Sequence, residues 1–320
     1  MQRVLDPTQI EAFAERQFPR IRLPEGDQLF ARRALRLREL SAAEGPGRGR
    51  SIADYLKLMA VVADAQHAAF AALPSLDASA PFRVDATDIE LARRHGMPPL
   101  LAVGRARDTS WRAVLDRICA AALESSDLTR LPEEVRTTCT RLRVAPAGLL
   151  EAQADAVLGL HSDEVDAATA PFVMAALQVY WLALERTLVA TEVSPLSVPG
   201  ICPVCGTLPV ASVVRVDRGA NGHRYLHCAL CAAEWHLVRV SCSQCQNVKD
   251  LGYYSIEGGN SAVQAEACPE CRSYRKILYQ EKDADVEPVA DDLASLALDL
   301  LMAEAGYQRG SGNPLLWQQP

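Results

Sequence analysis

The chain has no long hydrophobic run. Although 49% of its 320 residues are hydrophobic, no stretch approaches the roughly eighteen uncharged apolar residues of a membrane-spanning helix. Residues 1–28 are polar and charged, and they lack the apolar segment of a secretory signal peptide. Ten cysteines without an export signal indicate a reducing compartment, where thiols stay free to bind metals. The sequence therefore predicts a cytoplasmic protein without a membrane span.

Motifs that identify enzymes are also missing. The sequence contains no phosphate-binding loop, no G-x-G-x-x-G fingerprint and no nucleophile elbow. These absences exclude the common signatures of nucleotide chemistry and acyl transfer. We therefore expect a binding protein, not an enzyme, with no catalytic residues.

Eight of the ten cysteines form a repeat. Each half reads C-x2-C-x22-C-x2-C, and the second half lies forty residues after the first. The first set is Cys202, Cys205, Cys228 and Cys231, and the second is Cys242, Cys245, Cys268 and Cys271. Two short loops that each offer two thiolates form a tetrahedral four-cysteine metal site. The spacing predicts two such sites with the cysteines paired in sequence, because interleaved loops would be longer and unequal.

The four cysteine ligands of each site do not determine which metal ion binds. Four thiolates in a tetrahedron suit zinc or a single rubredoxin-type iron. Gly206 follows the first Cys-x-x-Cys pair and lets backbone amides approach the sulfurs, whereas Ala232, Gln246 and Arg272 stand at the matching positions. A metal ion saturated by four thiolates has no open position, which excludes hydrolytic metal catalysis.

Other polar side chains near the cysteines have structural interpretations. A full set of four thiolate ligands leaves no vacancy for His223, His227 or His236, so supporting or packing roles are expected. Trp235 and Tyr274 follow the knuckles and are expected to cover them.

Two further groups lie in the helical half. Cys119 and Cys139 are expected to be buried small apolar residues, not nucleophiles. The basic run Arg32, Arg33, Arg36 and Arg38 predicts either a solvated helix face or a docking surface for an acidic partner.

The charge of the chain disfavours nucleic-acid binding. Lys and Arg number 33 against 40 Asp and Glu, a formal net charge of −7. Residues 201–280 carry eight Lys and Arg against six Asp and Glu. Four thiolates leave about −2 around each divalent ion, which cancels that small excess. A phosphate-binding surface needs clustered positive charge, so no nucleic-acid partner is expected.

Hydrophobic periodicity predicts an α+β protein. Helices are expected over residues 29–43, 51–73, 88–94, 109–123, 132–142, 146–158, 171–189 and 291–305. Short β-rich runs occupy residues 209–216, 224–227, 251–256 and 277–279. We expect an all-α domain (1–195), two tandem rubredoxin-like ribbons (196–240 and 241–284), and a C-terminal helix with its tail (285–320). The tail, 308–320, is either a loose end or a docking strap.

Several segments resemble the formate dehydrogenase accessory protein family, FdhE. They include Cys202-Pro203-Val204-Cys205-Gly206, Arg224-Tyr225-Leu226-His227-Cys228, Glu234-Trp235-His236, Lys276-Ile277-Leu278-Tyr279-Gln280-Glu281-Lys282-Asp283, Val289-Ala290-Asp291-Asp292-Leu293-Ala294-Ser295-Leu296, Asp54-Tyr55-Leu56 and Ala170-Pro171-Phe172. The likeness spans most of the chain and is looser between residues 74 and 170.

The resemblance implies a cytoplasmic maturation factor for respiratory formate dehydrogenases. Such a protein would bind the catalytic subunit before its export through the twin-arginine route. The resemblance also implies a helical domain followed by two rubredoxin-like modules, with iron or zinc bound by the eight named cysteines.

Three alternatives to a client-binding factor remain open. A rubredoxin-like electron-transfer protein would act on the cofactor of the client and would require iron. A zinc-ribbon nucleic-acid binder conflicts with the charge, and a scaffold would lack a specific client. Homo-oligomerisation is compatible with each alternative.

Overall fold

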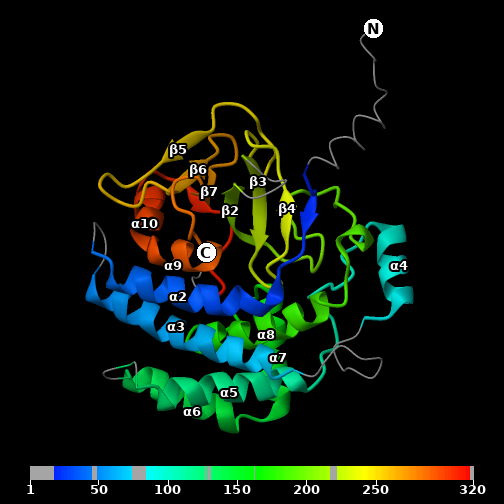
Figure 1. The fold of residues 1–320 in the computed structure, drawn as a ribbon, viewed down its shortest axis with the longest axis vertical. Helices are drawn as coiled ribbons and strands as arrows, with labels where there is room; N and C mark the ends of the chain where they lie inside the picture. The colour runs from blue at the N-terminus through cyan, green and yellow to red at the C-terminus, as the bar shows by residue number, and fades with distance from the viewer. Residues whose placement is uncertain are drawn as a thin grey trace.

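A computed structural model describes residues 18–44, 49–73, 84–126, 128, 131–161, 163–216 and 222–317 of the chain. Helices dominate as far as residue 185, and strands dominate from residue 209 onward (Figure 1). The predicted mixed helical and strand architecture is confirmed. The expectation that no signal peptide is present falls mostly on residues 1–17, outside the described residues.

The first half is built from helices whose bounds follow the apolar periodicity closely. They are α2 (Leu29–Ala42), α3 (Arg50–Ala71), α4 (Ala86–His95), α5 (Ser110–Glu124), α6 (Glu133–Val144), α7 (Ala147–Gly159) and α8 (Ala170–Glu185). Short 3-10 turns lie at Gly26–Gln28 (η1) and Ala190–Glu192 (η2). The last helix ends four residues before the predicted 189. No helix within the described ranges combines the length and apolar character needed to cross a membrane.

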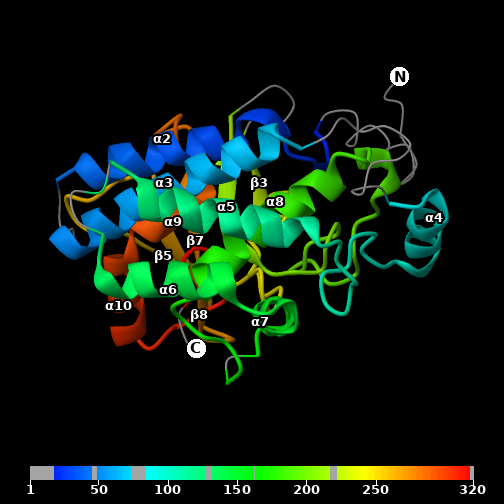
Figure 2. The same cartoon turned by 90° about the horizontal axis from the view of Figure 1, so that it is seen from below.

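Helix α8 is the centre of the helical half. Every residue from Ala170 to Glu185 is buried, so the helix has no solvent-exposed face. The helix contacts α3, α5 and α7, and α6 packs outside α5 (Figure 2). The Trp181 indole donates to the carbonyl of Leu100 at 3.0 Å, which satisfies its buried N–H.

The two cysteine repeats contribute to one sheet. Its strands are β1 (Ile21–Arg22), β2 (Pro209–Arg215), β3 (His223–Cys228), β4 (Glu234–His236), β5 (Gly252–Tyr254), β6 (Val263–Ala267), β7 (Ser273–Tyr279) and β8 (Gln308–Arg309). The order is β1-β4-β3-β2-β7-β6-β5, with β8 paired to β7. Parallel pairing of Ser212–Val214 on β2 with Ile277–Tyr279 on β7 joins the repeats. The ribbons are therefore continuous through the sheet.

The N-terminal region is not wholly helical, so the all-α prediction is wrong at Ile21–Arg22. These residues pair antiparallel with Trp235 and Glu234 of β4. Ile21 is buried, and the Arg22 guanidinium lies 3.7 Å from the Glu234 carboxylate. Two residues are too few to show an alternating strand pattern in the sequence. They form a strand because the sheet edge at β4 provides their hydrogen-bonding partners.

The predicted C-terminal helix is two helices, α9 (Pro288–Ala294) and α10 (Leu296–Glu304). Ser295 interrupts them with φ −112° and ψ 34°. The buried Lys276 ammonium donates to the carbonyls of Asp292 and Ser295 at 2.8 and 3.1 Å. The Ser295 and Leu298 N–H groups also donate to these carbonyls, at 3.3 and 3.0 Å, so a side chain and i→i+3 bonds meet where the two helices join.

Two of the four arginines in the basic run of α2 face inward, so neither interpretation holds for Arg33 and Arg36. Arg32 is exposed, and Arg38 pairs with Asp64 at the partly exposed surface. Arg33 is 1% exposed and contacts Glu287 at 3.0 Å. Arg36 makes a bidentate pair with Asp291, at 2.9 and 2.7 Å. These contacts attach the helical half to α9.

The C-terminal tail is a strap within its described part. Arg309 lies in β8, and Leu315 is fully buried. The Tyr55 hydroxyl on α3 donates to the Leu315 carbonyl at 2.5 Å. Residues 308–317 therefore run from the second repeat back to the helical half.

Burial of Glu185 gives the fold a pH dependence. This side chain ends α8 at 2% exposure, and burial raises the pKa of its carboxyl from 4.5 to about 8. Because the folded-state pKa is raised, the contribution of the protonated Glu185 carboxyl to the free energy of unfolding is full below pH 4.5. This contribution is lost progressively as the pH rises from 4.5 through 8. We expect Glu185→Gln to raise the free energy of unfolding at pH 7 by about 3 kcal/mol. Urea denaturation from about pH 5 to 8.5 measures this gain, and a gain independent of pH contradicts it.

Candidate metal centres

The first set of cysteines converges on one point. Cys202 and Cys205 lie in the turn before β2, while Cys228 ends β3 and Cys231 follows it. All four sulfurs lie within 4.8 Å of one another. The closest approaches are 3.4 Å between Cys205 and Cys228 and 3.6 Å between Cys202 and Cys231.

The second set repeats this geometry. Cys245 and Cys268 sulfurs lie 3.6 Å apart, and those of Cys242 and Cys271 lie 3.7 Å apart. These four sulfurs also lie within 4.8 Å of one another. The structure thus brings together the same two sets that the forty-residue repeat indicated, and each group could hold a metal ion.

Corresponding turns use matching backbone hydrogen bonds. The Cys202 N–H donates to the Thr207 carbonyl at 2.9 Å, and the Gly206 N–H donates to the Cys202 carbonyl at 2.9 Å. In the second repeat, the Cys242 N–H donates to the Asn247 carbonyl at 2.8 Å, and the Gln246 N–H donates to the Cys242 carbonyl at 3.0 Å. The turns therefore present both thiols of each pair on one side.

Each turn also requires a left-handed residue after its second cysteine. Gly206, Ala232, Gln246 and Arg272 have φ values of 77°, 59°, 63° and 54°. A Cβ disfavours this conformation, so three of the four positions are strained. The sequence indicated a left-handed conformation only at Gly206, because alanine, glutamine and arginine are not residue types that favour positive φ.

Sequence analysis missed the polar groups beside the sulfurs. The Thr207 hydroxyl lies 3.1 Å from the sulfurs of both Cys205 and Cys228. The Ser273 hydroxyl lies 3.0 Å from that of Cys271. Both residues stand two positions after a second cysteine, and this shared offset was the available signal.

The electrostatics of the clusters favour a bound cation. Burial raises the pKa of the Cys202 and Cys231 thiols. Burial also acts to raise the pKa of Cys268, but N–H donors from Cys271 and Asn247 stabilise its thiolate and bring the pKa to about 7. Four adjacent thiolates repel one another strongly unless a cation lies between them. The donor set therefore fits a tetrahedral divalent or trivalent metal ion.

The two clusters differ in exposure. All four cysteines of the first cluster are buried. In the second cluster, Cys245 and Cys271 are exposed. The identical spacing of the repeats gave no indication of this difference, which arises because the first repeat packs against the helical half. There, the N–H groups of Leu100 and Ala102 donate to the carbonyls of Val204 and Cys205 at 2.9 Å.

Comparisons with known proteins identify the family. The chain matches "FdhE, N-terminal" over residues 18–197, "FdhE, central domain" over 201–239 and "FdhE, C-terminal domain" over 240–316. The chain belongs to the FdhE family. The FdhE homologue of Edwardsiella ictaluri is 41% identical over 92% of this chain and 90% of its own. That of Stutzerimonas stutzeri is 40% identical over 98% and 97%.

A solved FdhE structure supports the fold. The crystal structure of the FdhE protein from Pseudomonas aeruginosa superposes with a TM-score of 0.80 at 37% identity. The match covers 94% of this chain and all of the other. The FdhE resemblance inferred from the cysteine turns and α9 is therefore confirmed.

The histidines lie outside both cysteine groups of the described chain. His227 contacts the buried Glu234 carboxylate at 3.1 Å. His223 stacks on Phe18 with ring centroids 4.0 Å apart, and His236 packs beside them. These contacts agree with packing roles.

The remaining singled-out side chains also have structural partners. The Trp235 indole donates to the Pro199 carbonyl at 2.6 Å, and the Tyr274 hydroxyl donates to Asp299 at 2.8 Å. Cys119 and Cys139 are fully buried, as expected, and their mutual hydrogen bond raises the pKa of Cys119.

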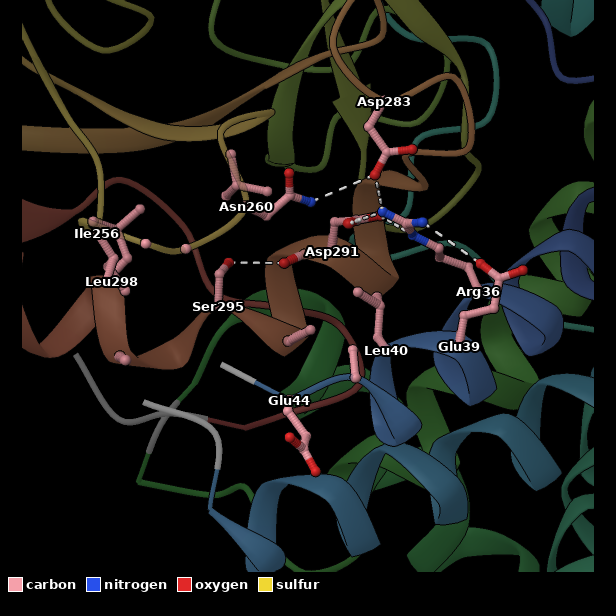
Figure 3. Close-up of a pocket in the computed structure, with 16 residues that line it drawn as sticks. Arg36, Glu39, Leu40, Glu44, Ile256, Asn260, Asp283, Asp291, Ser295 and Leu298 are labelled. Carbon is pink, nitrogen blue, oxygen red and sulfur yellow. Dashed lines mark hydrogen bonds and ion pairs between the residues drawn. The ribbon is translucent and has the colours of Figure 1, made fainter. Parts of the chain in front are cut away.

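A cavity of about 400 Å³ is lined by residues that include none of the eight clustered cysteines (Figure 3). It is bounded by α2, the loop after β5 and the α9–α10 junction. Arg36 reaches across it to Asp283 and Asp291, while Leu40 and Leu298 form apolar walls. Arg36 pairs with Glu39, Asp283 and Asp291, and Glu44 is the remaining charged residue of the described lining. The described lining therefore presents no candidate acid, base or nucleophile constellation.

The left-handed turns generate a prediction about stability. Gln246→Gly should raise the free energy of unfolding of the metal-loaded protein by about 1 kcal/mol, because glycine adopts φ 63° without strain. Gly206→Ala should lower it by about 2 kcal/mol or more, since the new Cβ would also lie 2.8 Å from Leu101. Denaturant midpoints measure both changes.

Gly148→Ala is the matched control for these variants. Gly148 lies within α7 with open space around its Cβ position. We expect a gain of up to about 1 kcal/mol there from helix propensity alone. A stabilised Gly206→Ala protein would contradict the proposed conformational requirement.

Proposed function

We propose that this protein is an accessory factor for the maturation of formate dehydrogenase. It binds the catalytic subunit in the cytoplasm before export and holds one metal ion, iron or zinc, in each four-cysteine site. Membership of the FdhE family along almost the whole chain carries this proposal. The two cysteine clusters support the metal sites. The ligands are Cys202, Cys205, Cys228 and Cys231 in one rubredoxin-like ribbon, and Cys242, Cys245, Cys268 and Cys271 in the other.

Metal binding supplies folding energy to the ribbons. Short strands and turns bury too little apolar surface to fix their own geometry, and a metal that binds only the folded form stabilises it. Each bound ion crosslinks two turns, while Thr207 and Ser273 hold the sulfurs beside them. The loops thereby keep a defined shape for recognition.

A composite surface of helices and ribbon is proposed to recognise the client. Met97, Leu101 and Val103 are exposed apolar side chains on the segment that pairs with the first turn. Val103 is 56% exposed, and a run of such side chains is suited to an apolar part of a protein partner. The first metal would position this segment through the bonds to Val204 and Cys205.

Removing one ligand tests the link between metal and client. We expect Cys245→Ser to lose one metal equivalent and to bind the formate dehydrogenase catalytic subunit at least about tenfold more weakly, a loss of about 1.4 kcal/mol. Elemental analysis and titration calorimetry measure the two effects. Cys119→Ala, at a buried cysteine outside both clusters, is the control and should retain both properties. Unchanged metal content together with unchanged client affinity in Cys245→Ser would refute the proposal.

An electron-transfer role is the second candidate. The exposure of Cys245 and Cys271 favours it, because electrons pass most readily through exposed ligands of a shallow metal site. This role requires iron, and a visible spectrum of anaerobically purified protein decides the question. Thiolate-to-iron bands that bleach on reduction are the expected result for this candidate. Two zinc ions and no visible bands would eliminate it and leave the client-binding factor.

A further inference from the structure

Four cationic side chains come from strands β3, β7 and β8 of the sheet. They are Arg224, Arg275, Lys276 and Arg309, and the first three are at most 3% exposed. Three of the four have carboxylate partners. Arg224 pairs with Glu266 at 2.8 Å, Lys276 with Asp299 at 2.7 Å and Arg309 with Asp292 at 2.5 Å. The four cations thus have three carboxylate partners among them.

Arg275 is the cation without a carboxylate partner among the described residues. Its Nε donates to the Ser243 hydroxyl at 2.9 Å. Its Nη1 donates to the Pro209 carbonyl and to the Ser311 hydroxyl. Its Nη2 is buried without a hydrogen-bond partner in the described structure. Each of these acceptors is neutral, so the guanidinium charge is not compensated there.

Such a charge is costly inside a protein. Removing an ion from water destabilises the folded protein unless an opposite charge compensates. Burial, together with the neighbouring Arg224 and Arg309, lowers the pKa of Arg275 to about 9. Asp292, already paired with Arg309, and the Cys242 sulfur act in the opposite direction. Cys242 belongs to the second cluster, and Ser243 is the next residue in the same turn.

We propose that Arg275 is the counter-ion of the second metal centre. The inference rests on the metal ligation described under the proposed function. Four thiolates around a divalent ion leave an excess charge of about −2, or about −1 around a trivalent ion. That excess provides the anion that the buried guanidinium lacks. Arg275 therefore stabilises the metal-loaded second site and acts on it through charge, without being a ligand.

Two substitutions of similar length separate charge from hydrogen bonding. Arg275→Met removes the charge, whereas Arg275→Lys keeps a charge but cannot make the same hydrogen bonds. Zinc affinities of the full chain are measured by competition with a chromogenic chelator. We expect the Met variant to bind the second-site zinc at least about tenfold more weakly, or about 1.4 kcal/mol. The Lys variant should stay within about threefold of the wild type, and the first-site affinity should be unchanged in both.

Arg107→Met is the matched control. The Arg107 side chain is 3% exposed in the helical half, where it pairs with Glu151 and Asp155 at 2.8 and 2.7 Å. Its loss should leave both zinc affinities unchanged. Equal weakening in Arg275→Met and Arg275→Lys would assign a hydrogen-bonding role and overturn the inference, as would an unchanged Met variant. A wild-type protein that takes up no second zinc would overturn both the proposed second metal centre and the inference about Arg275. A wild-type protein that binds two zinc ions, with an unchanged Met variant, would overturn only the inference about Arg275.

Discussion

Buried ion pairs of the short helix α9 hold the protein together. Glu287 and Asp291 bind Arg33 and Arg36 of α2, while Asp292 binds Arg309 beyond α10. Buried charges stabilise only when they are paired with good geometry, and loss of one partner leaves an expensive isolated ion. The orientation of the sheet on the helical half therefore depends on a seven-residue helix and its N-cap Glu287. Two of their carboxylates bind α2 and the third binds Arg309.

This arrangement gives the two cysteine clusters different environments. The first is enclosed by its own ribbon and by the segment around Leu100, which pairs with its turn. The second has two exposed ligands and, on its inner side, the uncompensated Arg275 guanidinium. A duplicated sequence motif thus supports an inner site suited to fixing shape and an outer site open to solvent. Under the proposed function, the two sites can serve client recognition separately.

Local patterns predicted local features well. Apolar periodicity located α2 through α8 within a few residues, and cysteine spacing identified the two clusters. Features set by distant partners escaped prediction. Strand β6 has little β-propensity of its own and exists because it pairs with β7. The break between α9 and α10 at Ser295 lies against Lys276 of β7. Arg33 and Arg36 turn inward because carboxylates about 250 residues later receive them. Such pairings leave no mark on the periodicity of either segment.

The separation between these partners also constrains how the protein is made. Arg33 and Glu287 are 254 positions apart. One edge of β2 pairs with β3, and the other edge stays unpaired until β7 has been synthesised. During synthesis the helical half emerges first, yet its α2 guanidinium groups find their carboxylates only after α9 has left the ribosome. Contacts of such long range slow folding, because a large loop must close before they form. The nascent chain therefore completes this assembly only after α9 has emerged.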